Sequence, residues 1–115
     1  MNLLTQCQTF DLLQNGDANK ASHGAKDFQP VVKLFTPWAG ATWLLSELNP
    51  EDQDIAFGLC DLGLGTPELG YVSLAELRNL RGRGGLTVER DLWFKAGKTL
   101  QAYADEARAY GCIKA

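Results

Sequence analysis

The chain has 115 residues, of which 45% are hydrophobic and 22% charged, and its formal net charge is −3. This length fits one domain (1–115), and the acidic balance argues against a general nucleic-acid coat protein, which is normally basic. The longest apolar runs are only a few residues, so we expect no membrane span. The opening residues 1–4 lack the basic and apolar regions of a secretory signal, and three cysteines make no disulfide framework. We therefore expect a cytoplasmic protein.

Residues 1–16 predict an amino-terminal helix. Thr5 is a suitable N-cap with Gln8 three residues later, and Gly16 is a typical C-terminal stop. The apolar residues at helical spacing are Leu4, Cys7, Phe10 and Leu13. Residues 17–29 then predict a polar loop, with polar composition beginning at Asn15.

Branched and aromatic residues next predict a run of short strands. The expected strands are 31–35, 42–48, 54–62 and 69–72. The turn chemistry at 49–52 makes the second and third of them an antiparallel hairpin.

A short helix follows, opened by Ser73 and Glu76 and broken by the glycines of 81–85. Short extended pieces are expected at 86–88 and 92–94. The last helix runs from about Thr99 to Tyr110. Its expected inward residues are Leu100, Tyr103, Ala104, Ala107 and Tyr110, and its expected cap is Gly111.

This element order predicts an α+β domain. We expect a small antiparallel sheet of three to five strands, with amino-terminal, short central and carboxy-terminal helices, in two layers with the terminal helices on one face. The aromatic residues expected in the core are Trp43, Phe57, Tyr71, Trp93, Phe94 and Tyr103. Trp38 lies in a predicted loop, where it either anchors an interface or folds back over the sheet edge.

The charges are divided along the chain. Residues 34–77 contain six acids before Glu76 and no base, whereas 78–98 contain six bases and two acids. The two regions either neutralise each other in the fold, or form an acidic face for a basic partner and an arginine patch for phosphate. An acidic face could also mimic nucleic-acid phosphates in the channel of a host enzyme. The candidate partner-binding residues are Trp38, Glu51, Asp52 and Asp54, and the candidate anion-binding residues are Arg81, Arg83 and Arg90.

Carboxylates around the predicted 63–67 loop are the candidates for catalysis. The candidate residues are Asp61, Glu68, Arg90 and Asp91. Asp61 could instead bond the loop backbone, as aspartate does in turns. The alternative reading is a small enzyme or ligand-binding domain with a pocket formed by Asp61, Glu68, Arg81 and Arg90, which requires these side chains to converge. No cysteine or histidine has metal-ligand spacing, so we expect no metal and no cofactor.

Several strings resemble the family known as domain of unknown function 2958 (DUF2958). They are Pro30–Thr36, Ala41–Leu45, Asp54–Gly65, Pro67–Leu74 and Val88–Leu92. The resemblance covers a family core of 30–113. It implies a small bacterial protein, often encoded on plasmids and other mobile elements, with an accessory role in transfer or in evading host defence.

These observations favour a non-enzymatic cytoplasmic accessory protein that binds another protein. The partner expected from the family setting is a host nucleic-acid enzyme or a component of a defence system. Direct binding of nucleic acid or membrane is not expected.

Overall fold

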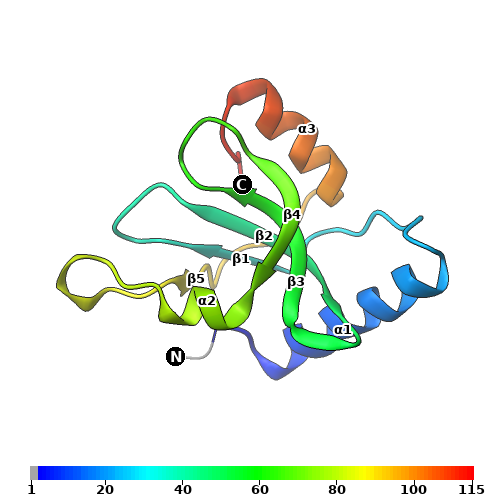
Figure 1. Ribbon diagram of the computed structural model, residues 1–115. Coiled ribbons are helices and arrows are strands. Elements are labelled where there is room, and N and C mark those ends of the chain that lie inside the picture. Colours follow the sequence, from blue (N-terminus) through cyan, green and yellow to red (C-terminus); the bar gives the residue numbers. More distant parts are fainter. Residues whose placement is uncertain (1–2) are drawn as a thin grey trace.

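The computed structural model describes residues 3–115; residues 1 and 2, at the start of the predicted first helix, lie outside the described part. Its helices are α1 (Gln6–Ala21), α2 (Leu74–Asn79), a short 3-10 turn η1 (Arg83–Gly85) and α3 (Leu100–Tyr110). Its strands are β1 (Val32–Phe35), β2 (Thr42–Asn49), β3 (Asp52–Asp61), β4 (Glu68–Ser73) and β5 (Glu89–Arg90). The predicted α+β class is confirmed (Figure 1).

Across the described residues, the strands pair antiparallel in one five-stranded sheet, in the order β4-β3-β2-β1-β5. The four longer strands fall within two residues of their predicted bounds because their branched and aromatic residues suit a sheet. The extended pieces expected at 86–88 and 92–94 were misplaced. The strand is Glu89–Arg90, which pairs with β1, and residues 92–93 form a turn.

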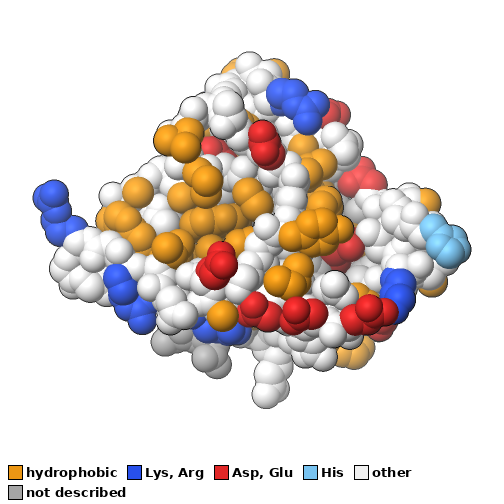
Figure 2. Space-filling model, in the orientation of Figure 1, with side chains coloured by type: hydrophobic (Ala, Val, Ile, Leu, Met, Phe, Trp, Pro, Cys, Tyr) orange, Lys and Arg blue, Asp and Glu red, His pale blue; other side chains and the backbone are white. Residues whose placement is uncertain are grey.

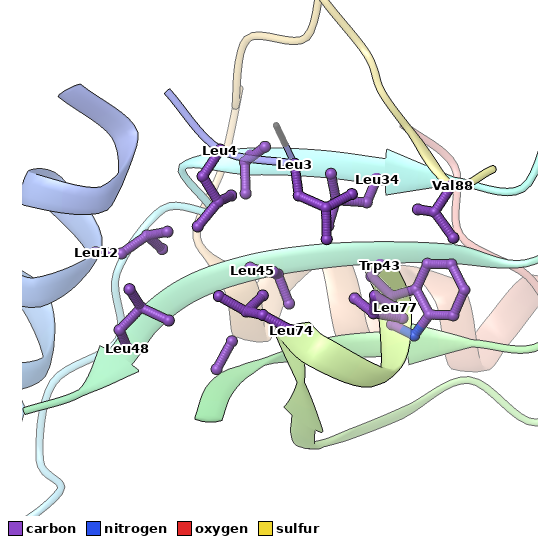
Figure 3. Close-up of a cluster of buried hydrophobic side chains, with 12 residues drawn as sticks. Leu3, Leu4, Leu12, Leu34, Trp43, Leu45, Leu48, Leu74, Leu77 and Val88 are labelled. Atoms are coloured by element: carbon purple, nitrogen blue, oxygen red, sulfur yellow. The ribbon is translucent and has the colours of Figure 1, made fainter. Parts of the chain in front are cut away.

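The sheet is buried on both faces, by different helices. One face, called here the α2 face, buries side chains of β1, β2 and β3 against Leu12 of α1 and Leu74 and Leu77 of α2 (Figure 3). The opposite face, called the α3 face, packs Leu44 and Leu59 against α3. The expectation that the terminal helices share one face was wrong, because consecutive residues of β2, Trp43, Leu44 and Leu45, are all buried and therefore need cover on both faces.

Helix α1 extends five residues beyond the predicted stop at Gly16. The capping box of Thr5 and Gln8 is present as predicted. Gly16 lies inside the helix at a close approach to β2, since a Cβ built there would lie 1.9 Å from the carbonyl oxygen of Leu48. The buried residues of α1 are Leu12 and Gly16, whereas Phe10 of the predicted stripe is 60% exposed.

The place of α1 follows from the difference in length between β1 and β2. Strand β1 pairs with Thr42 to Leu45 only, so the second half of β2 has no strand neighbour on that side. Helix α1 lies against β2, and the side-chain amide of Asn15 donates to the carbonyl oxygen of Ser46 at 2.9 Å. A bare strand edge pairs readily with other chains, and α1 covers this one.

A β-bulge at Ser46 changes which residues of β2 reach each face. Leu45 pairs with Gly58, but Glu47 pairs with Phe57, so Ser46 is an extra residue on the β2 side. Regular alternation would place Glu47 on the α2 face with Leu45. The extra residue instead turns Glu47 to the α3 face and brings Leu48, 1% exposed, into the buried cluster of the α2 face.

Helix α3 matches the prediction closely. Thr99 caps its start by accepting from the amide of Ala102, and Gly111 ends it in the left-handed conformation at φ 75°. Tyr110, expected to face inward, is 67% exposed. Among the helices of residues 3–115, none has both the length and the apolar character needed to cross a bilayer.

The contact at Gly16 can be tested by adding one methyl group. We expect Gly16→Ala to destabilise the protein by about 1–3 kcal/mol, because the close backbone contact outweighs the ~1 kcal/mol gain in helix propensity. Gly97→Ala is the control, since nothing lies within 4 Å of a Cβ there, and we expect a change within about 0.5 kcal/mol. Urea denaturation measures both, and equal stabilities would contradict the packing described for α1.

Candidate functional site

The four candidates for catalysis do not share one site. Asp61 is 3% exposed, and its carboxylate accepts from the amides of Gly63 at 2.8 Å and Ile113 at 3.0 Å. Glu68 pairs with Cys60 across the sheet, so these two side chains lie on the same face. Asp61 is the residue after Cys60 and therefore points to the opposite face from Glu68. Arg90 and Asp91 lie at the opposite edge of the sheet, beyond β2 and β1. Asp61 therefore has the loop-bonding role that was the alternative in the sequence.

A hollow of about 500 Å³ does lie beside the 65–67 loop, at the end of β4. Its charged lining residues are Glu68 and Arg108 of α3, and neither Asp61, Arg81 nor Arg90 lines it. The pocket proposed from those four residues is therefore not assembled.

The candidate anion-binding arginines are placed separately. Arg81 donates to the carbonyl oxygens of Arg78 at 2.5 Å and Leu80 at 2.9 Å, which satisfies the end of α2. Arg83 is in the exposed turn η1, and Arg90 is in β5. Two glycine amides of this loop donate within the loop, from Gly82 to the carbonyl of Leu86 and from Gly85 to the carbonyl of Gly82.

The acidic partner-binding candidates lie together at the β2–β3 turn, but they are occupied by local contacts. Glu51 forms an ion pair with Lys20 of α1, which lowers the pKa of Glu51. Asp54 accepts from the hydroxyl of Ser73 at 2.5 Å and from the amide of Ala75 at 2.8 Å. These two bonds hold the pKa of Asp54 below its usual value. Asp54 thus fastens β3 to the start of α2.

Trp38, the remaining partner-binding candidate, is in the β1–β2 turn at the other end of β2 from Glu51. The ring is half-buried and packs on the glycine loop, because a Cβ on Gly82 would lie 2.1 Å from the indole. Of the two alternatives left open by the sequence, the folded-back position is the one observed. Trp38 and the acidic turn therefore do not form a continuous surface.

The surface charges are mixed more evenly than the sequence order suggests. Figure 2 shows acidic side chains along the lower edge of the molecule, with basic side chains on both sides of them. The same view shows hydrophobic side chains over the middle of this face. Two ion pairs join residues that are far apart in the sequence, Lys20 with Glu51 and Lys33 with Asp91.

A cleft of about 400 Å³ lies on the α3 face, between the sheet and the segment that precedes β1. Its floor is a cross-strand row of three side chains, Glu47 on β2, Phe57 on β3 and Tyr71 on β4. The two rings lie 5.1 Å apart between centroids, tilted by 57°. The next row, Leu44, Leu59 and Leu69, is covered by α3, which leaves the Glu47 row open.

The walls of the cleft are the segment 24–28 and the start of α3. This segment is fixed to α3 by two bonds, from the amide of Leu100 to the carbonyl of Phe28 at 2.8 Å and from the amide of Gln101 to the carboxylate of Asp27 at 3.1 Å. Its sharp entry uses positive φ at His23 and Gly24. The end of the wall at residues 27 and 28 is thereby fixed to α3.

Asn19 of α1 joins this wall to the floor. Its side-chain nitrogen donates to both carboxylate oxygens of Glu47, at 2.9 and 3.0 Å, and its side-chain oxygen accepts from the amide of Lys26 at 3.1 Å. A second hollow of about 250 Å³ shares Asn19, Glu47 and the aromatic pair, and extends toward Lys20. The carboxylate of Glu47 is therefore held in one orientation at the junction of two hollows.

The carboxylate of Glu47 can accept more hydrogen bonds than it receives from the described residues. A carboxylate offers about four lone-pair positions, and Asn19 uses two at most. No lysine, arginine or histidine among residues 3–115 forms an ion pair with it. Within the same residues, no three histidine, cysteine or acidic side chains come together as a set that could hold a metal ion. The cleft is thus suited to a hydrogen-bond donor with an apolar body.

Glu47, Asn19 and Tyr71 were not among the site residues proposed from the sequence. Asn19 fell in the predicted loop, and Tyr71, expected in the core, is 72% exposed because the cluster under α3 does not include it. No pattern in the sequence marks the bulge that turns Glu47 to the α3 face, because Leu44, Ser46 and Leu48 fit the alternation of a regular strand.

The family described as Protein of unknown function (DUF2958) matches residues 3–114, and the chain belongs to this family. No curated protein matches the chain significantly, and neither does any solved structure.

The two acids at the 63–67 loop can be separated by stability. We expect Asp61→Asn to cost about 1–3 kcal/mol, because the new amide nitrogen cannot accept one of the two backbone bonds and leaves a buried donor unpaired. Glu68→Gln, at an exposed residue, should change stability by less than about 0.5 kcal/mol. Thermal and urea unfolding measure both. Equal effects would contradict the structural role of Asp61.

Asp54 predicts a pH-dependent contribution to stability. Because its pKa is lowered in the folded state, the contribution is present above the ordinary aspartate pKa of about 3.9. It is lost as the pH falls through the lower folded-state pKa. We therefore expect Asp54→Asn to be less stable than wild type at pH 7, with the difference narrowing in acid. Asp17→Asn, in an exposed part of α1, should follow the wild-type profile; a constant Asp54→Asn difference down to pH 2 would contradict the assignment.

Proposed function

We propose that this member of the DUF2958 family is a non-enzymatic protein that binds a partner protein through the cleft on the α3 face. The observation that carries the proposal is the fixed carboxylate of Glu47 beside the half-buried ring of Phe57 and the exposed ring of Tyr71. Concave sites that join an apolar wall to a few oriented polar groups are the usual form of binding pockets.

Two further observations support a binding role over catalysis. Asp61 and Asp54 bind backbone or hydroxyl groups of the fold, and Asp91 accepts from the amide of Trp93. Tyr71 stands 72% exposed on the edge strand β4. Tyrosine is among the residues that contribute most at protein interfaces, since it presents a large rigid surface with a polar end.

The biological setting we propose follows from the family resemblance. The protein acts in the bacterial cytoplasm as an accessory protein of a mobile element, and its partner is a host nucleic-acid enzyme or a component of a defence system. In this role the cleft engages the partner, and the acidic turn near Glu51 stabilises the fold.

The test is affinity capture from bacterial cytoplasm with tagged wild type, Tyr71→Ala and Tyr110→Ala, followed by mass spectrometry. Tyr110 is a matched control because it is 67% exposed on α3 and does not line the cleft. We expect a stoichiometric partner on wild type and Tyr110→Ala, and about tenfold weaker retention on Tyr71→Ala. Equal retention by all three proteins would remove the cleft from the interface.

A further inference from the structure

We propose that the cleft takes a lysine- or arginine-type side chain, with its cationic head on the carboxylate of Glu47 and its aliphatic stem across the rings of Phe57 and Tyr71. This inference rests on the proposed function and names the chemistry of the group that the partner presents.

The first step concerns the charge. Of the three carboxylates that line the cleft and the adjoining hollow, Glu51 is paired with Lys20, and Asp27 bonds the start of α3. Glu47 alone combines a fixed orientation with no cationic partner among residues 3–115. A half-buried carboxylate gains most from a ligand that brings both a positive charge and N–H donors.

The second step concerns shape. Glu47, Phe57 and Tyr71 occupy three adjacent strands in one row, so the row spans two strand spacings, or roughly 10 Å. A stem of three or four methylenes lies along such a row while its head reaches the carboxylate. The exposed ring of Tyr71 at the open end also suits contact with a cation or with the stem.

The third step excludes other groups. An anionic group entering this cleft would meet Glu47, and a purely apolar group would cover the carboxylate without supplying a donor, which is unfavourable. The first amides of α3, which could otherwise bind an anion, already donate to other groups. Their acceptors are Thr99, Asp27 and Phe28.

Lys26 provides a sharp internal comparison. It also lines the cleft, and its ammonium is not paired with Glu47. A cationic ligand is repelled by this lysine, whereas an anionic ligand would use it. Removing its charge therefore affects the two kinds of ligand in opposite directions.

The experiment is an NMR titration of the ¹⁵N-labelled protein with acetyl-Gly-Arg-Gly-amide at millimolar concentrations. Parallel titrations use peptides with lysine, glutamine or glutamate in place of arginine. We expect saturable shifts of the Asn19 side-chain amide and the Tyr71 backbone amide with the arginine and lysine peptides only. Preference for the glutamate or glutamine peptide would overturn the proposal, and so would ethylguanidinium binding as tightly as the arginine peptide, since the cleft would then serve free small cations.

Variants make the test specific for the carboxylate. Glu47→Gln should weaken the arginine peptide about tenfold or more, the usual effect of removing one charged partner of a hydrogen bond. Glu68→Gln, on the other face, should leave the affinity unchanged, and Lys26→Gln should tighten it. Unfolding temperatures and dispersed amide spectra establish that each variant is folded. Unchanged affinity in Glu47→Gln, or weaker binding in Lys26→Gln, would overturn the proposal.

Capture of the partner separates this inference from the proposed function. Loss of the partner with both Tyr71→Ala and Glu47→Gln supports both statements. Loss with Tyr71→Ala alone leaves the cleft as the interface and overturns the cationic side chain. Retention by both variants overturns the proposed function as well.

Discussion

The extra residue at Ser46 is the constraint on which the rest of this structure depends. Leu45 and Leu48 are both buried on the α2 face, and two residues of one strand that are three apart share a face only across a bulge. The bulge has two consequences. It sends Glu47 to the opposite face, and it brings Leu48 into the buried cluster beside Leu12 of α1. The side-chain amide of Asn15 fastens α1 to the carbonyl oxygen of the same Ser46, at the part of β2 that β1 does not reach. From the same helix Asn19 then reaches Glu47 and the segment that walls the cleft. One irregularity in the sheet thus sets the position of a carboxylate, which the helix packed beside it then holds in place.

Features that depend on neighbours in the sequence were predictable. The four longer strands, the capping box of Thr5 and the start and end of α3 follow from local preference and are confirmed. The end of α1 was not predictable from local preference. Gly16 lies inside the helix because it packs closely on the backbone of Leu48, which is distant in sequence. The exposure of Tyr71 was not predictable either, since it depends on which part of the sheet α3 covers.

The polar residues illustrate the same distinction at the level of chemistry. Asp61, Asp54 and Arg81 were attractive as functional groups because of their type and spacing, but each is used to satisfy backbone groups that the fold would otherwise leave unpaired. Such duties cannot be read from a sequence, because the partner groups lie in loops and helix ends. Glu47 differs because its carboxylate is oriented by another side chain and keeps unused acceptor positions.

The two buried clusters on either side of the sheet differ in size: among residues 3–115, the α2 face has twelve buried residues and the α3 face has six others. Separate clusters of unequal size are expected to open as separate cooperative units, and the smaller one opens at lower free energy. Helix α3 supplies most of the smaller cluster and also holds one end of the cleft wall through Leu100. Partial unfolding that detaches α3 would therefore release the wall and leave the floor of β2, β3 and β4 in place. In hydrogen exchange, amides of the cleft wall are consequently expected to exchange with solvent before amides of the cleft floor.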